Sequence, residues 1–215
     1  MSEPIEQLQR WLDSLGESLP AQWALMPDIG LYMDQVQTYI DRQLGLYRYD
    51  DQDRLLTPAM INNYIKDDLI PRAEAKKYSP VHLALLIIIA TLKQVLSMQD
   101  LNRLLSVYRD KEAVARLYAQ FLDVQSRCLR DNVSHSQEEL CQMRQAVEQA
   151  EVDEAATAES HEAALRELAL ELCIEARTKI LIAEKILAVL PSSQREEDSS
   201  QRPKNNNRKK EKPQS

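Results

Sequence analysis

Two adjacent amides and a nearby lysine are the side chains in this sequence best suited to recognising another molecule. Asn62, Asn63 and Lys66 lie in the segment TPAMINNYIK, which begins at Thr57. An asparagine amide can pair with N6 and N7 of adenine, and a lysine can meet a phosphate or a guanine. Asparagine is a mediocre helix former, so two of them inside a helix need a reason. The alternative is that these residues form an ordinary solvated helix face.

The segment from Thr57 to Lys66 is predicted to be a helix with these side chains on its outer surface. Thr57 followed by Pro58 is a strong start signal, because threonine caps a helix and proline suits its first position. At 100° per residue, one face carries the apolar side chains Ile61, Tyr64 and Ile65, which should pack inward. The remaining surface carries Ala59, Asn62, Asn63 and Lys66.

The order of segments around this helix resembles the MerR-type winged helix-turn-helix. LIP follows at 69–71, then KKY at 76–78, a helix led by Pro80, and SMQDL at 97–101. In the MerR-type pattern, a capped recognition helix leaves through a Gly-Leu-Ile/Leu-Pro exit into a wing that ends in tyrosine. The resemblance implies that the residues contacting duplex DNA are Thr57, Ala59, Asn62, Asn63, Lys66, Arg72, Lys76, Lys77 and Tyr78.

Four blocks together are also similar to the bacterial family called domain of unknown function 1836. They are LYMDQV at 31–36, LTPAMINNYIK at 56–66, KKYSPVHLALL at 76–86 and LKQVLS at 92–97. The resemblance covers about residues 20–110. The family label carries no established activity, only a suspected relation to helix-turn-helix proteins.

Charge is the feature that departs from the MerR-type pattern. Asp68 stands where that pattern has glycine, although aspartate tolerates a left-handed backbone better than most residues. Asp67 and Asp68 also bring negative charge to a place that should approach phosphates. Residues 28–110 hold ten Lys and Arg against eleven Asp and Glu. Because DNA affinity depends on neutralising phosphates, a DNA-binding protein must gather its basic side chains on one surface: Lys66, Arg72, Lys76 and Lys77.

Composition excludes several classes of function. The chain has 215 residues, only three of them glycine, and a net charge of −7. So little glycine favours long helices and leaves none for a glycine-rich phosphate loop or a nucleophile elbow. A generally basic nucleic-acid coat is excluded by the charge. The three histidines and three cysteines are too scattered for a zinc site. We therefore expect no enzyme, no catalytic residue, no metal and no cofactor.

The chain is predicted to be all-α. A MerR-like winged helix-turn-helix, with at most a minimal β wing, precedes long C-terminal helices and a disordered tail. Helix caps are expected at Ser79, Ser97 and Asp110, a new helix after Ser136, and a left-handed cap at Gly45. The predicted divisions are an N-terminal helix and connection at 1–27, the helix-turn-helix domain at 28–110, a dimerisation or sensing region at 111–190, and the tail at 191–215.

Two hypotheses for function follow. The acidic N-terminal segment has no apolar core and is not expected to be a signal peptide, and the longest apolar run, residues 83–92, is about half the length of a membrane span. We therefore expect a cytoplasmic protein with no membrane partner. The first hypothesis is a transcriptional regulator that binds double-stranded DNA as a homodimer, with its C-terminal helices supplying dimerisation or ligand sensing. An apolar stripe at helical spacing in residues 163–190 needs a partner helix, either elsewhere in the chain or on a second copy: Leu165, Leu168, Leu172, Ala176, Ile180, Ala183, Leu187 and Leu190. The second hypothesis is a helical protein-interaction module on the same scaffold, without DNA binding.

Overall fold

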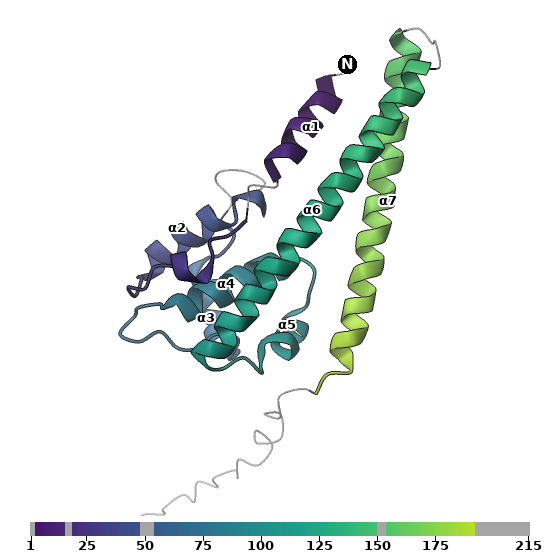
Figure 1. The fold of residues 1–215 in the computed structure, drawn as a ribbon. Coiled ribbons are helices and arrows are strands. Elements are labelled where there is room, and N and C mark those ends of the chain that lie inside the picture. The colour runs from purple at the N-terminus through teal and green to yellow at the C-terminus, as the bar shows by residue number, and fades with distance from the viewer. Residues whose placement is uncertain (1–2, 16–18, 48–53, 150–153, 192–215) are drawn as a thin grey trace, which may run out of the picture.

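Seven helices make up most of the part of the chain that the computed structural model describes, residues 3–15, 19–47, 54–149 and 154–191 (Figure 1). Two short 3₁₀ turns, Trp23–Leu25 and Gly45–Tyr47, lie in the connections. These described residues contain no extended strand, which confirms the all-α class. Residues 192–215, where the sequence predicts a disordered tail, lie outside them. The helices are α1 (Glu3–Leu15), α2 (Met33–Gln43), α3 (Pro58–Lys66), α4 (Pro80–Leu92), α5 (Met98–Leu105), α6 (Lys111–Gln149) and α7 (Glu154–Ala188).

The apolar run of residues 83–92 lies in α4, the central helix of the larger hydrophobic core. Every residue from His82 to Ala90 is buried, so α4 is covered on all sides. Such a helix needs partners around its whole circumference. Buried side chains of α2, α3 and α5 supply part of this cover, among them Val36, Ile61 and Leu101. The structure thus confirms that this run is a buried core helix.

The first turns of α6 belong to the same core. Val114 and Tyr118 are fully buried in the cluster that contains α4. The Tyr118 hydroxyl donates to the carbonyl oxygen of Ala21 at 2.8 Å, which ties α6 to the segment before α2. Burial raises the pKa of Tyr118, so this hydroxyl keeps its proton. The hydrophobic core therefore continues beyond residue 110.

The rest of α6 forms a long antiparallel hairpin with α7 (Figure 1). The predicted new helix after Ser136 is wrong, because α6 runs without interruption from Lys111 to Gln149. Ser136 is buried instead of capping a helix. Beside it, the Gln137 amide donates to Asp13 of α1 at 2.8 Å. Packing of α1 and α7 against α6 thus outweighs a local sequence signal for a helix start. A second, smaller cluster joins these three helices: Leu12, Leu15, Leu140 and Leu168.

The left-handed cap expected at Gly45 is also wrong. No glycine among the described residues has a positive φ. The amide of Leu44 donates to the carbonyl of Ile40 at 3.0 Å, and the chain then tightens into the turn Gly45–Tyr47. Tyr47 in turn accepts a hydrogen bond from Gln125 of α6 at 2.9 Å. The chain thus leaves α2 through a 3₁₀ turn that contacts α6, without a left-handed residue.

Candidate nucleic-acid interface

Helix α3 is built as the sequence predicts. The Thr57 hydroxyl oxygen accepts a hydrogen bond from the amide of Met60 at 3.2 Å, and Pro58 occupies the first turn. Ile61 and Tyr64 are buried, and Ile65 is half-buried against the same core. The opposite surface is open to solvent and carries Ala59, Asn62, Asn63 and Lys66. The two adjacent amides are therefore exposed.

Asp68 ends α3 in the conformation that glycine usually supplies. Its φ is 57°, in the left-handed region. The amide of Leu69 donates to the carbonyl of Tyr64 at 2.9 Å, and the amide of Asp68 donates to Ile65 at 3.3 Å. This pair of bonds is the Schellman arrangement of a helix C-terminus. The expectation that aspartate can stand in for the missing glycine is confirmed.

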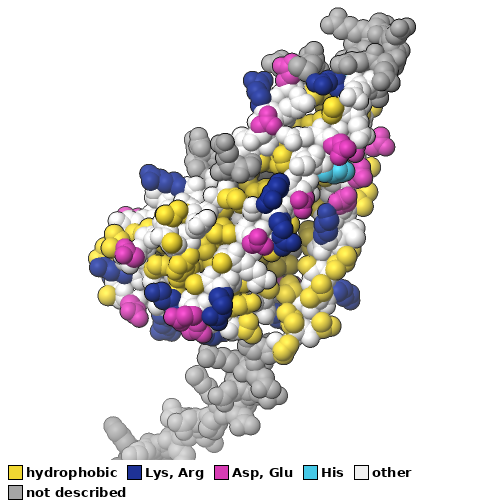
Figure 2. Space-filling view, viewed as in Figure 1, with side chains coloured by type: hydrophobic (Ala, Val, Ile, Leu, Met, Phe, Trp, Pro, Cys, Tyr) yellow, Lys and Arg dark blue, Asp and Glu magenta, His cyan; other side chains and the backbone are white. Residues whose placement is uncertain are grey.

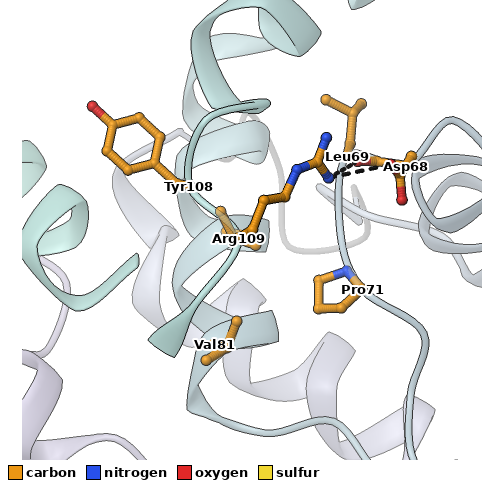
Figure 3. A pocket seen from close by; sticks show the side chains of 7 residues that line it. Asp68, Leu69, Pro71, Val81, Tyr108 and Arg109 are labelled. Carbon is orange, nitrogen blue, oxygen red and sulfur yellow. Dashed lines mark hydrogen bonds and ion pairs between the residues drawn. The ribbon is translucent and has the colours of Figure 1, made fainter. Parts of the chain in front are cut away.

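Two side chains from beyond α4 hold this end of α3. The Arg109 guanidinium donates to the carbonyl of Asp68 at 2.9 Å and lies 3.3 Å from its carboxylate (Figure 3). The Asn102 amide of α5 donates to the carbonyl of Asp67 at 3.1 Å. Cations and donors at a helix C-terminus stabilise its unpaired carbonyls. Arg109 thus also offsets the charge of one of the two acids that argue against DNA binding.

Sequence reasoning missed Arg109, because it lies 41 residues from Asp68 and no local pattern links them. The guanidinium reaches over a cavity of about 330 Å³ at the exit from α3 (Figure 3). Side chains of α4 (Val81, Leu85) and of the exit segment (Leu69, Pro71) form the apolar part of its wall, and polar groups form an almost equal part. The cavity is lined by Asp68, Leu69, Pro71, Val81, Leu85, Tyr108 and Arg109.

A tight hairpin with a two-residue turn lies where a wing with at most minimal β structure is predicted. The amide of Lys77 donates to the carbonyl of Glu74 at 2.8 Å, and the two residues form an isolated β-bridge. Between them, Ala75 and Lys76 have φ angles of 48° and 63°. Positive φ at both central residues is what a type I′ turn requires, and it is the turn that suits a tight hairpin. For residues with a Cβ this conformation costs about 1–2 kcal/mol each.

A second bridge fixes the hairpin to the chain before α2. Leu31 and Tyr78 exchange two backbone hydrogen bonds of 2.9 and 2.8 Å. Gly30 makes this approach possible, because a Cβ there would lie 2.7 Å from Cβ of Lys77. The Lys77 ammonium lies 5.7 Å from the centre of the Tyr32 ring. Sequence reasoning did not identify Gly30 or Tyr32, since their contacts depend on a pairing 47 residues apart.

The structure corrects the expectation for Tyr78. The MerR-type resemblance implies that Tyr78 contacts DNA, but its side chain is buried, 5% exposed. Its ring packs edge-on against His82, with 5.3 Å between ring centres. His82 in turn accepts a hydrogen bond at Nδ1 from the amide of Ser79 at 3.0 Å. Tyr78 therefore anchors the base of the hairpin and does not present its ring at the surface.

The remaining residues of the predicted set are exposed. They are Thr57, Ala59, Asn62, Asn63, Lys66, Arg72, Lys76 and Lys77. Acidic side chains are interspersed with the basic ones over the end of the molecule that holds α2 to α5, on the face shown in Figure 2. Asp67 and Glu74 are exposed next to Lys66 and the hairpin. The structure thus exposes the amides and the lysines, but not on a uniformly basic surface.

Within the described ranges, no three or more His, Cys, Asp and Glu side chains come together in a group that could hold a metal ion. Over the same ranges, none of the helices combines the length and the apolar character that crossing a bilayer demands.

Comparison with known proteins confirms the second resemblance seen in the sequence. No match was found among curated proteins or among solved structures. A family model does match, over a segment that runs from the turn before α2 into the first third of α6. Residues 21–121 of the chain match the family described as Domain of unknown function (DUF1836).

Proposed function

We propose that this protein is a transcriptional regulator that binds duplex DNA through α3 and the hairpin Glu74–Lys77. The observation that carries the proposal is the pair of exposed amides, Asn62 and Asn63, on a short helix fixed at both ends. Adjacent amides on the outer surface of a recognition helix can meet adenine edges in the major groove. The proposal takes the MerR-type arrangement as its working picture, with α3 as the recognition helix.

Rigid support of α3 is the second argument. The Thr57 cap holds its start, and the bonds from Asn102 and Arg109 hold its end. A side chain that reads a base must be held close to its productive geometry by residues around it. A solvated surface helix would not require clamps from two later segments.

The strained hairpin is the third argument. Ala75 and Lys76 both keep an unfavourable positive φ, and lysines at 76 and 77 are exposed at and beside the turn. Strained backbone persists only where surrounding structure enforces it, and it is concentrated at functional sites. A tight loop that carries two cations suits phosphate contacts next to the helix. Lys66 and Arg72 would extend these contacts along the DNA backbone.

The proposal is tested by binding titrations at several salt concentrations, on a duplex selected from a random-sequence library with the full chain. Asn62→Ala or Asn63→Ala should cost about 1–3 kcal/mol on the selected duplex and relax preference at one base position. Lys76→Ala and Lys77→Ala should weaken binding to all duplexes and reduce the salt slope by about one unit each. Arg166→Ala is the matched control, since Arg166 is an exposed cation on α7.

The outcome against DNA binding is equally definite. If no duplex binds in low salt, or if the four variants and the wild type bind alike, DNA reading is excluded. The function is then the interaction module on the same scaffold.

One observation favours this second candidate. Ile29 and Tyr32 are 70% and 51% exposed, and Lys77 lies against the Tyr32 ring. Exposed tyrosine beside an apolar side chain is typical of the centre of a protein interface. Acidic side chains are interspersed with the basic ones around Ile29, Tyr32 and Lys77. This patch therefore suits a partner protein whose surface carries charges of both signs. In this case Tyr32→Ala, and not Asn63→Ala, should abolish capture of the protein partner.

A further inference from the structure

Helix α7 is apolar on two opposite sides, and only one of them is covered. On the inner side, Leu168 and Leu187 are buried, 6% exposed each. The outer side carries an apolar row at four-residue steps, interrupted once by Thr178. We call it the outer row: Leu170 (62% exposed), Ile174 (59%), Thr178, Ile182 (56%) and Ile186 (57%). Residues four apart form one of the ridges through which helices pack, so the outer row has the form of a helix-packing surface.

Neighbouring side chains widen this row into a substantial surface. Leu181 and Val189 flank it and are 46% and 81% exposed. Figure 2 shows hydrophobic side chains gathered along the lower part of α7. The surface there has a shallow, open hollow of about 420 Å³, lined by Leu181, Ile182, Lys185, Ile186 and Val189. Contiguous exposed apolar surface of this kind marks an interaction site.

We propose that the outer row pairs with the outer row of a second copy of this chain, with the two α7 helices antiparallel. The row is symmetric about Thr178, since Leu170 and Ile186 lie eight residues to either side and Ile174 and Ile182 lie four. Antiparallel pairing about Thr178 therefore places Leu170 opposite Ile186 and Ile174 opposite Ile182, with Thr178 facing its own copy at the centre. Two equal contacts related by a two-fold axis are the usual form of a homodimer.

Charge selects the antiparallel orientation. Glu171 and Lys185 are exposed at the edges of the row, seven residues before and seven after Thr178. Antiparallel pairing sets each carboxylate against the ammonium of the other copy, whereas parallel pairing sets like charges together. The whole helix has the same asymmetry. Residues 159–175 hold five acidic and one basic residue, and residues 176–190 hold three basic and one acidic.

The chain's own C-terminal segment offers nothing to cover the row. Residues 192–215 contain no leucine, isoleucine, valine, methionine or aromatic residue. The inner side of α7 is occupied by α6 and α5. A second copy, with its identical row, is thus the occupant that the chemistry favours. This inference does not rest on DNA binding.

Sedimentation equilibrium of the full chain tests the dimer. One helix against one helix over about 24 Å is a small interface, so we expect a micromolar dissociation constant. Ile182→Asp should weaken the dimer at least tenfold, because it buries a charge opposite Ile174 of the other copy, one step from the centre of the row. The residue is exposed in the single chain, so the thermal melt measured at concentrations where the chain is monomeric should not change. Val124→Asp on α6 is the matched control, 40% exposed in the wild type.

Charge reversal tests the orientation. Glu171→Lys and Lys185→Glu should each weaken the dimer at least threefold, and the double variant should restore wild-type affinity. A monomer at 100 µM, an effect of Val124→Asp equal to that of Ile182→Asp, or a double variant weaker than both single variants would overturn the proposal. Binding of neutral lipid vesicles without self-association would assign the row to a membrane surface and would also overturn it. DNA binding is measured separately, so either proposal can fail alone.

Discussion

At the residue scale, the backbone strain of the described chain is concentrated in the proposed interface. Three described residues other than glycine have a positive φ, and all three lie between α3 and α4: Asp68, Ala75 and Lys76. Asp68 is held there by the Schellman bonds and by Arg109. Ala75 and Lys76 are held by the two bridges of the hairpin. These contacts offset a local cost of a few kcal/mol, which gives the exit from α3 one defined path.

Gly30→Ala is the residue-scale prediction. The added Cβ would lie 2.7 Å from Cβ of Lys77, which is too close to the backbone to move away alone. The Leu31–Tyr78 bridge must open, so we expect a loss of about 1–3 kcal/mol in the free energy of unfolding, measured by urea titration. Gly45→Ala is the control, because nothing lies within 4 Å of a Cβ there. Equal losses in the two variants would mean that the close approach is not what requires glycine at 30.

At the element scale, α3, α5 and α6 are each started by the side chain of the residue before them. The Ser97 oxygen accepts from the amide of Asp100 at 3.1 Å at the start of α5, and Asp110 accepts from Ala113 at 2.7 Å at the start of α6. These expected caps are confirmed. The start of α4 differs in that its third residue is a histidine whose Nδ1 accepts from the amide of Ser79. A titratable group therefore holds the start of the core helix.

His82→Gln tests this contribution through pH. Burial is the main cause that lowers the pKa of His82 from 6.5, while the backbone at Arg72 and Pro71 and the Glu74 charge act in the opposite direction. The unfolded chain then binds more protons than the folded one in the window below pH 6.5. The stability that neutral His82 contributes is full above about pH 6.5 and is lost as the pH falls from there through the lowered pKa of the folded state.

Glutamine keeps an acceptor for the Ser79 amide but does not titrate in this range. Urea titrations at pH 7.5, 6.5 and 5.5 should therefore show a smaller decline for His82→Gln than for the wild type. His135→Gln, at an exposed position, serves as the control and should follow the wild type. Parallel curves for all three proteins would show that His82 keeps its ordinary titration in the fold.

At the scale of the whole molecule, a compact helical end and a long hairpin share α6. The larger core joins α2, α3, α4 and α5 to the first turns of α6. The far part of α6 packs with α1 and α7 in the smaller cluster. The packed helices α6 and α7 would therefore link a second copy bound to the outer row with the core that holds α3. Two recognition helices related by a two-fold axis would favour a near-palindromic DNA site.

Leu168→Ala and Leu170→Ala compare the two sides of α7. Leu168 is 6% exposed, so its truncation should cost about 2–4 kcal/mol in the free energy of unfolding. Leu170 is 62% exposed, so its truncation should change that free energy by no more than about 0.5 kcal/mol when the chain is monomeric. Chemical denaturation at low protein concentration measures both. The assignment of inner and outer sides is wrong if Leu170→Ala is the more costly change.

Local chemistry is what the sequence by itself determined. The threonine cap with proline after it, the serine and aspartate caps of α5 and α6, and the inward face of α3 follow from residues within four positions of one another. The apolar run of α4 similarly required burial. Hydrogen bonds and helix faces at this range need no knowledge of the fold, so they can be predicted from neighbouring residues.

The tertiary structure decided everything that joins distant segments. Arg109 at Asp68, Gly30 at Lys77 and the burial of Tyr78 depend on which segments pass each other in space. Packing also extended α6 through Ser136, where the local signal predicted a new helix. The apolar stripe that includes Leu168 and Leu187 was predicted from its spacing, yet only the structure distinguishes it from the outer row. Both rows are apolar at helical spacing, and which one packs against α6 depends on the neighbours that the fold supplies.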